Sequence, residues 1–158
     1  LLLSKRKNIV LMDCDFNHNP KDILRLIEKF EKNNLDFIVG SRFKIVKFRS
    51  LKLRFILSYF YCLILSKFLG YNYSDSLSGF FIIKKKVINK ISLKKVFFGY
   101  GDYFFRLIYF LSKKKLKVDE IQIKYGSRIH GYSKTNFIKV FLKYTYEAIK
   151  LKIYDQKN

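Results

Sequence analysis

Two acidic residues and an amide follow a short apolar segment near the start of this chain. Residues 8–12 (NIVLM) have the length and composition of a strand that is buried on both faces of a sheet. Asp13, Asp15 and Asn17 come directly after it, at alternate positions. Side chains two residues apart share a face of an extended segment, so we expect these three to converge. Carboxylate and amide oxygens suit a hard divalent cation, Mg2+ or Mn2+, that carries a diphosphate.

The same pair of acids has two other interpretations. Carboxylates after a strand are often no more than solvated loop residues, and we expect His18 to lie in such a solvated loop. Phosphatases of the haloacid dehalogenase type also place a D-x-D pair after an apolar strand, and Asp13 would then be the nucleophile. Those enzymes need a further acidic pair downstream, but after Gly101 this chain has Asp102 followed by Arg106 instead of a second aspartate. The phosphatase interpretation is therefore the weaker one.

The surrounding sequence predicts one α/β domain over residues 1–158. Asn19 and Pro20 are a typical helix start, and apolar residues recur on one helical face to about Lys32. Residues 35–39 (LDFIV) form a second apolar strand, which completes a strand, helix, strand unit. Further elements are expected at 80–83 (strand), 99–115 (helix), 118–125 (strand) and 137–153 (helix). We expect a mostly parallel sheet flanked by helices, with ligands bound beyond the carboxyl ends of its strands.

Residues 51–69 form a very apolar segment that also has two interpretations. Its uncharged centre, residues 55–66, lies between Arg54 and Lys67 and is too short to span a bilayer, which needs roughly 20 residues. The aromatic residues and the basic flanks suit a helix that lies in a membrane interface. A helix packed into the protein core fits equally well. The C-terminal segment 137–153 is expected to be a basic amphipathic helix.

The formal charge of +21 raises a third, non-enzymatic interpretation, a basic module that binds nucleic acid or an anionic membrane. The biased composition weakens it, because a chain that is rich in Lys, Ile, Asn, Phe and Tyr and has a single Pro is typical of an AT-rich genome. Cys14 and Cys62 have neither metal-binding nor redox spacing, which indicates a reducing compartment without disulfides. The chain starts with Leu, and we expect it to be a fragment.

Further short motifs follow the two acids in the order found in one family. They are Gly40-Ser41-Arg42, Arg54 with Ser58, Asp75 with Ser78-Gly79-Phe80, and Arg128 with Gly131, Ser133 and Lys134. Together with Asp13, Asp15, Asn17, His18 and Pro20, this series resembles the family 2 glycosyltransferases, and within them the dolichol-phosphate or polyprenol-phosphate mannosyltransferase branch. The resemblance covers the whole chain and implies part of a GT-A fold, the Rossmann-like fold of nucleotide-diphospho-sugar transferases, with its first strands missing.

The resemblance also implies a reaction. It is metal-dependent inverting transfer of a hexose, mannose or glucose, from a GDP-mannose or UDP-glucose type donor to a polyprenyl or dolichyl phosphate. Asp13 and Asp15 would be catalytic and, with Asn17, would hold Mg2+ or Mn2+ and the donor diphosphate. The acceptor phosphate would be bound by Arg42, Arg54, Ser58, Arg128 and Lys134. An arginine fork suits this task because it meets phosphate oxygens bidentately.

The chain departs from the family pattern at two positions. Leu77 replaces a usual Thr in the motif that contains Asp75, Ser78 and Gly79, and Arg106 stands about where the family has an acid, so that Asp102 could replace that acid. The family implies action at the cytoplasmic face of a membrane, with an anchor from another domain or subunit and without nucleic acid as a partner. Because the family begins with a strand and loop that bind the nucleotide base, we expect this fragment alone to be inactive.

Overall fold

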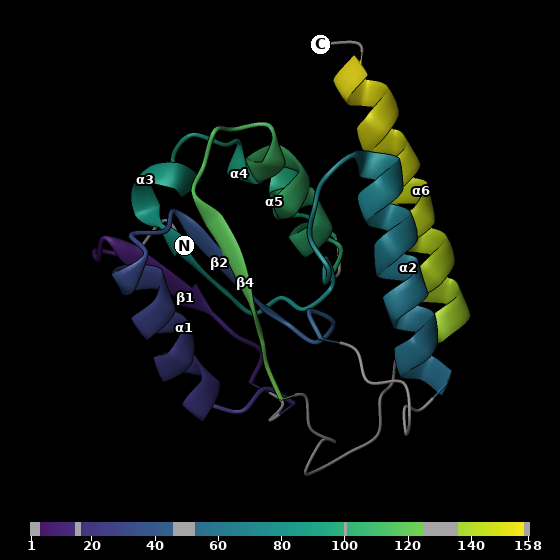
Figure 1. Ribbon diagram of the computed structural model, residues 1–158. Helices are drawn as coiled ribbons and strands as arrows, with labels where there is room; N and C mark the ends of the chain where they lie inside the picture. Colours follow the sequence, from purple (N-terminus) through teal and green to yellow (C-terminus); the bar gives the residue numbers. More distant parts are fainter. Residues whose placement is uncertain (1–3, 15–16, 46–52, 100, 125–135, 157–158) are drawn as a thin grey trace.

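A computed structural model of the chain describes residues 4–14, 17–45, 53–99, 101–124 and 136–156 (Figure 1). Asp15, Arg128 and Lys134 lie outside the described residues. The elements in chain order are β1 (Asn8–Leu11), α1 (Lys21–Lys32), β2 (Phe37–Ser41), α2 (Leu53–Leu69), β3 (Phe81–Lys84), α3 (Lys85–Ile88), α4 (Leu93–Val96), α5 (Tyr103–Ser112), β4 (Val118–Gln122) and α6 (Phe137–Gln156). The fold is α/β, as the sequence predicted, and each predicted strand and long helix is present with shifted ends.

The four strands form one mixed sheet in the order β1-β3-β2-β4. β3 is antiparallel to both of its neighbours, and Ile83 pairs with Ile9 of β1 and with Phe37 of β2. Only β2 and β4 pair in parallel, with Val39 opposite Glu120. The prediction of a mostly parallel sheet is therefore wrong, because β3 pairs antiparallel with both β1 and β2. The strands β1, β2 and β4 nevertheless run in the same direction. The cause is the segment before β3, which returns to the end of β2, so that β3 starts at that end and runs back.

Both faces of the sheet are covered at β2 and β3, whereas the prediction that residues 8–12 are buried on both faces is wrong, because Val10 of the edge strand β1 is 41% exposed. Side chains alternate along a strand, so Phe37 and Val39 of β2 face one way and Ile38 faces the other. The first face packs against the apolar residues of α5, and the second packs against α1 through Leu26 and Phe30. α1 begins at Lys21 with Pro20 as its N-cap, one residue later than the Asn19 cap that the sequence predicted, although Asn19 Oδ1 still accepts a hydrogen bond from the backbone N–H of Lys21 at 3.0 Å. The sheet is thereby held between two helical layers.

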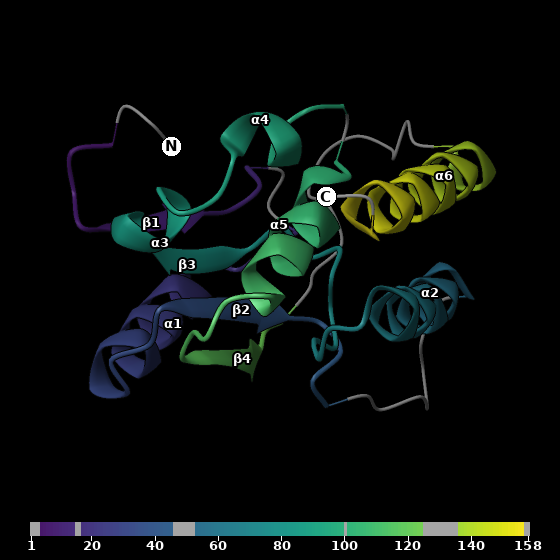
Figure 2. The ribbon, with the colours of Figure 1, turned by 90° about the horizontal axis from the view of Figure 1, so that it is seen from above.

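Helices α2 and α6 lie side by side, next to the sheet and its covering helices (Figures 1 and 2). The Tyr61 and Phe141 rings are 4.7 Å apart, and the Tyr61 and Thr145 hydroxyls are 3.2 Å apart. Tyr61, Cys62, Leu65 and Leu69 of α2 are buried, which agrees with a helix packed into the core, while its opposite side is exposed and its place in a membrane interface stays a prediction. Within the described ranges, no helix has the length and apolar character that crossing a membrane would require.

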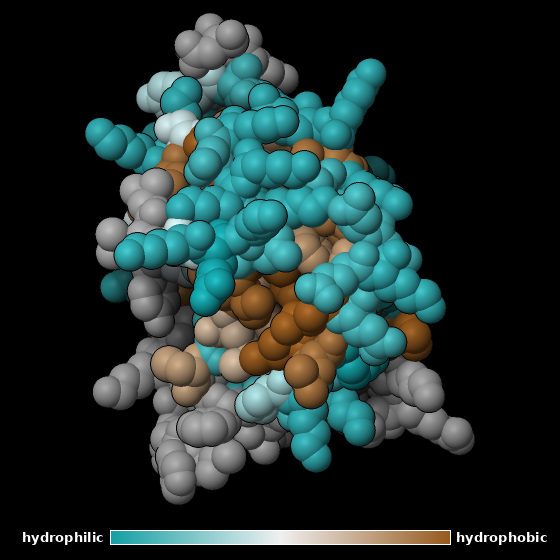
Figure 3. Space-filling model, turned by 90° about the vertical axis from the view of Figure 1, so that its left-hand side faces the viewer, coloured by the Kyte–Doolittle hydropathy of each residue, from teal (hydrophilic) through white to brown (hydrophobic). Residues whose placement is uncertain are grey.

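The opposite side of the molecule, which carries β1 and α1, has a small apolar patch among hydrophilic side chains (Figure 3). Val10 of β1 and Leu24 of α1 are exposed there. β1 is an edge strand of the described sheet and pairs only with β3.

Asp119 on β4 joins α1 and the segment after β2 to the sheet edge. Its carboxylate lies 2.6 Å from Lys29 Nζ and 3.0 Å from Lys44 Nζ. Partial burial alone would raise the pKa of Asp119, but the hydrogen bonds from Lys29 and Lys44 outweigh it and lower the pKa from 3.8 to about 2. The folded state therefore favours the ionised carboxylate.

We predict that this group contributes about 1 kcal/mol to the free energy of unfolding above pH 3.8, and that the contribution is lost as the pH falls towards 2. Asp119→Asn should make stability fall less steeply with acidification. Urea unfolding of both proteins at pH 6 and pH 3 measures this. Glu31→Gln, at an exposed position on α1, is the control and should leave the pH dependence unchanged. Equal slopes for Asp119→Asn and the parent protein would contradict the prediction.

Candidate functional site

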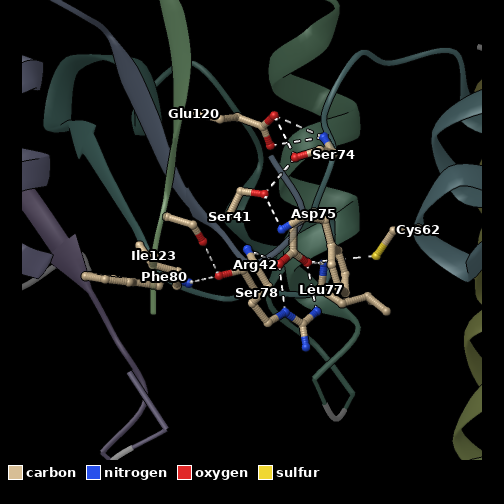
Figure 4. Close-up of polar contacts among 12 residues, drawn as sticks. Ser41, Arg42, Cys62, Ser74, Asp75, Leu77, Ser78, Phe80, Glu120 and Ile123 are labelled. Atoms are coloured by element: carbon tan, nitrogen blue, oxygen red, sulfur yellow. Dashed lines mark hydrogen bonds and ion pairs between the residues drawn. The ribbon is translucent and has the colours of Figure 1, made fainter. Parts of the chain in front are cut away.

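Several sequence-predicted site residues meet at one edge of the sheet. Asp13 lies two residues beyond the carboxyl end of β1, and Arg42 follows the carboxyl end of β2 directly. Asp75, Ser78 and Gly79 lie in the segment that leads into β3 at the same edge (Figure 4). This is the edge at which open α/β sheets bind ligands, because loops from several strands converge there.

A buried ion pair between Arg42 and Asp75 is the strongest link across this edge. Arg42 donates from Nε to Oδ2 at 2.7 Å and from Nη2 to Oδ1 at 2.8 Å, and its backbone N–H donates to Oδ2 at 2.9 Å. The backbone N–H of Leu77 and the thiol of Cys62 also donate to Oδ1, at 3.2 and 3.8 Å. Asp75 is completely buried and the Arg42 side chain is 11% exposed. The carboxylate therefore fixes the direction of the guanidinium, whose proposed contact with an acceptor phosphate stays a prediction.

A chain of polar contacts supports the ion pair from the side of β4. The hydroxyls of Ser41 and Ser74 are 2.6 Å apart, and Ser74 donates to the Glu120 carboxylate from its N–H and its hydroxyl, both at 3.0 Å. Burial raises the pKa of Glu120, the hydrogen bonds from Ser74 act against this, and the nearby Asp75 raises it further. Ser74 and Glu120 were missed by the sequence analysis. They are distant from each other in sequence, and neither belongs to a recognisable motif.

Two glycines in the motifs allow the backbone segments to approach closely. A Cβ on Gly40 would lie only 2.8 Å from the Phe80 ring, and the Gly40 N–H donates to the Phe80 carbonyl at 2.9 Å. Ser78 completes this junction by donating from Oγ to the Gly40 carbonyl at 2.5 Å. Gly79 has a φ of +70°, in the left-handed region that glycine tolerates best. These motif residues therefore dock the segment before β3 onto the end of β2.

The close approach brings both the Asp13 carboxylate and the Tyr103 hydroxyl next to Gly79. A Cβ on Gly79 would lie 3.1 Å from the Tyr103 hydroxyl and 3.9 Å from Asp13 Oδ1. Asp13 is exposed, while Tyr103 is partly buried at the start of α5. Burial, and secondly the charge of Asp13, raise the pKa of Tyr103 to about 12. At neutral pH the site thus has an anionic oxygen acceptor next to a neutral hydroxyl that can donate a hydrogen bond.

Tyr103 was not predicted as a site residue. The only local signal is its position directly after Gly101 and Asp102, because a helix that starts after a glycine-rich turn presents its first side chains at the sheet edge. The contact with Gly79 depends on the tertiary fold and could not be read from spacing.

The other residues near Asp13 that were considered for binding the metal and the sugar donor differ in their surroundings. Asn17 is 6% exposed and His18 is 2% exposed. The prediction of a solvated His18 is wrong, because its ring packs 5.1 Å from the ring of Phe80. Asp15 is outside the described residues, and within those residues there is no group of three or more His, Cys, Asp or Glu that could hold a metal. The exposed carboxylate of Asp13 fits a hard cation by its chemistry, and the metal site as a whole stays a prediction.

Arg54 and Ser58 lie on the first turns of α2, beside the Arg42 segment. Phe43, directly after Arg42, has its ring 4.8 Å from that of Phe55 and 5.5 Å from that of Tyr59. These contacts hold the start of α2 against the end of β2. Arg54 is exposed and Ser58 is partly buried, whereas Arg128 and Lys134 are outside the described residues. Their predicted contacts with an acceptor phosphate are untested.

Asp102 lies away from the exposed part of the site. It is completely buried and forms an ion pair with Arg106, which is 1% exposed. Asp102 therefore does not occupy the place of a solvent-facing acid, and the pairing disfavours its use as the downstream acid of a phosphatase.

The two aspartates at the sheet edge should differ sharply when mutated. Asp75→Asn leaves the Arg42 guanidinium largely buried without its charge partner, and we expect a loss of roughly 3 kcal/mol in the free energy of unfolding. Asp13→Asn removes an exposed charge, and we expect a change within about 0.5 kcal/mol. Chemical denaturation of both variants measures this difference. Similar stabilities for the two variants would contradict the structural role of Asp75.

Comparisons with known proteins agree with this arrangement. Residues 3–92 match the family described as Glycosyl transferase family 2. The chain is 32% identical over 150 residues to an uncharacterized protein of Methanocaldococcus jannaschii, covering 87% of this chain and 61% of that protein. It is 31% identical over 155 residues to a dolichol-phosphate mannosyltransferase of Pyrococcus furiosus, covering 89% of this chain and 40% of that enzyme. This chain thus spans less than two thirds of either relative, and it belongs to glycosyl transferase family 2.

Proposed function

We propose that the protein containing this chain transfers a hexose, mannose or glucose, from a nucleotide diphosphate sugar to a polyprenyl phosphate. The observation that carries the proposal is the sheet edge where exposed Asp13 and the hydroxyl of Tyr103 both lie next to Gly79. Membership of family 2 and the similarity to an enzyme named dolichol-phosphate mannosyltransferase support it. Donors of the GDP-mannose and UDP-glucose type are the candidates.

Asp13 is proposed to face the donor diphosphate. Together with Asp15 and Asn17 it would hold Mg2+ or Mn2+, which would neutralise the departing diphosphate. The neutral hydroxyl of Tyr103 also lies next to Gly79 and can donate a hydrogen bond to an oxygen in the same space. The site would thus combine a carboxylate that can bind a cation with a hydroxyl that can donate a hydrogen bond to an anion.

The acceptor phosphate is proposed to lie on the side of Arg42. A phosphate oxygen attacks the anomeric carbon, the bond from that carbon to the diphosphate breaks, and the diphosphate leaves with the bonding electrons. A lipid phosphate is already anionic near neutral pH, so it needs cations that orient it more than a strong base. These contacts would come from four basic side chains and one hydroxyl, those of Arg42, Arg54, Arg128, Lys134 and Ser58. The bidentate contact with Asp75 supports this assignment by holding Arg42 in one direction.

The α2–α6 surface is proposed to rest on the cytoplasmic face of a membrane, where the lipid acceptor would be found. Its exposed apolar side chains on α2 include Leu57, Phe60, Ile64 and Phe68, and those on α6 include Ile138, Leu142, Tyr146, Ile149 and Ile153. Basic residues lie on both helices, a combination that suits an anionic lipid interface. A further domain or subunit could add an anchor.

We predict that Asp13→Asn in the full-length protein lowers hexose transfer by at least about a hundredfold, because the cation and diphosphate lose a charged ligand. Incubation with Mg2+ or Mn2+, polyprenyl phosphate and radiolabelled GDP-mannose or UDP-glucose measures the lipid-linked product. Asp36→Asn, just before the opposite end of β2, is the control and should retain activity. A fully active Asp13→Asn would remove the donor-site assignment, and a parent protein that makes no lipid-linked sugar from any donor would refute the function.

The membrane proposal predicts weaker vesicle binding when the α2 surface loses apolar area. Phe60 and Ile64 are 51% and 61% exposed and lie four residues apart on one side of α2. The double variant Phe60→Ser and Ile64→Ser should lower partitioning onto vesicles that contain phosphatidylglycerol by roughly tenfold or more. Leu24→Ser, at a 70% exposed position on α1, is the matched control. Equal sedimentation of the double variant and the parent protein would contradict the proposal.

A further inference from the structure

Arg106 is a fully buried cation that contacts Val96, Phe98, Asp102 and Glu147. Its Nε donates to the carbonyl of Val96 at 2.9 Å, and its two terminal nitrogens donate to Asp102 Oδ2 and to the carbonyl of Phe98. Nη1 also lies 3.7 Å from Glu147 Oε2. The guanidinium carbon is 3.7 Å from the centre of the Phe98 ring. Such a charge is retained inside a protein only when its hydrogen bonds and ion pairs replace the lost water.

These contacts fix the glycine-containing turn that leads into α5. Gly99 and Gly101 have φ values of +76° and +72°, which L residues rarely adopt. A Cβ on Gly99 would lie 2.9 Å from Asp102 Oδ1, and a Cβ on Gly101 would collide with the Tyr144 hydroxyl. The turn is therefore packed between Asp102, which Arg106 holds, and Tyr144 of α6.

Tyr103 is the first residue of α5 and comes directly after this turn. Its ring stacks on that of Phe97 at 5.4 Å with 25° between the planes. Phe97 lies between Val96 and Phe98, whose carbonyls both bind Arg106. Arg106 thus holds the residues before and after Phe97, on whose ring the Tyr103 ring stacks, and we expect the position of the Tyr103 hydroxyl beside Gly79 to depend on them.

The same cluster reaches α6 through Glu147 and Tyr144. The Tyr144 ring lies 5.8 Å from that of Phe105, and Ala148, next to Glu147, is 2% exposed. On the far side of α6, Tyr146 and Ile149 are exposed. One helix therefore contacts the Arg106 cluster with one side and presents apolar residues to the surroundings with the other.

We propose that Tyr103 is a further residue that binds the sugar donor. Arg106 and Glu147 are positioning residues, through which the packing of α6 affects the position of the Tyr103 hydroxyl. The Tyr103 hydroxyl would donate a hydrogen bond to an oxygen of the donor diphosphate. Glu147 would act only through Arg106 and the turn, because its contact is with the guanidinium. The inference rests on the proposed function, since it takes the ligand of the Asp13 edge to be a nucleotide diphosphate sugar and the outer side of α6 to face lipid.

A double-mutant cycle in the full-length protein tests the link. Tyr103→Phe keeps the ring and removes the hydroxyl, and it should raise the KM for the donor about tenfold. Glu147→Gln keeps the shape and removes the charge, and it should raise the donor KM about threefold. If Glu147 acts through Tyr103, the double variant should resemble Tyr103→Phe alone. A thirtyfold rise, the product of the single effects, would overturn the link, and an unchanged KM for Tyr103→Phe would overturn the binding role.

Two further measurements separate this link from general damage to the fold. Glu147→Asp should restore part of the lost donor affinity, and thermal unfolding should show that Tyr103→Phe and Glu147→Gln remain folded. Vesicles with phosphatidylglycerol should lower the donor KM of the parent protein but not that of Glu147→Gln. An equal response of both proteins to vesicles would contradict the role of α6.

Failure of the inference can be told apart from failure of the proposed function. Titration of the full-length protein with GDP or UDP in the presence of Mn2+ measures binding at the donor site without any transfer. If Tyr103→Phe weakens this binding and no transfer occurs, the binding role stands and the proposed function fails. If transfer occurs and Tyr103→Phe neither weakens binding nor raises KM, the inference fails alone.

Discussion

The buried ion pair between Arg42 and Asp75 is the contact on which the rest of the site depends. Removing a guanidinium and a carboxylate from water is costly, and two parallel hydrogen bonds with two additional backbone donors offset that cost here. The pair joins the end of β2 to the segment before β3. This junction makes β3 start at the same end of the sheet and run antiparallel between β1 and β2. It also places Gly79 next to Asp13 and Tyr103.

The acidic residues near the site divide into two classes by their surroundings. Asp75 and Asp102 are fully buried and each faces an arginine, while Glu120 is partly buried and accepts hydrogen bonds from Ser74. These three carboxylates are occupied by the protein itself and hold loops in place. Asp13 is exposed at the end of β1, with a hydroxyl and a glycine nearby. Asp13 is thus more exposed than these three carboxylates, which supports its proposed contact with a ligand.

Local patterns in the sequence were sufficient for the class of fold. The apolar run before Asp13 predicted a strand, and the Asn19–Pro20 pair predicted the start of α1 to within one residue, because both depend on residues that are close in the chain. The direction of β3 could not be predicted, since it depends on where Asp75 binds. The burial of His18 against Phe80 and the meeting of Tyr103 with Gly79 are also contacts between distant segments. The apolar helix α2 has one buried side and one exposed side, because its two sides have different neighbours.

We propose that the site next to Asp13, at the carboxyl end of β1, binds a divalent cation and the diphosphate of the sugar donor. The most direct measurement is a crystal structure of the full-length protein with Mn2+ and GDP or UDP, with anomalous scattering used to locate the manganese. We predict manganese bound to the Asp13 carboxylate and a diphosphate oxygen within hydrogen-bond distance of the Tyr103 hydroxyl. Manganese and diphosphate bound elsewhere, with no ligand at Asp13, would contradict the account.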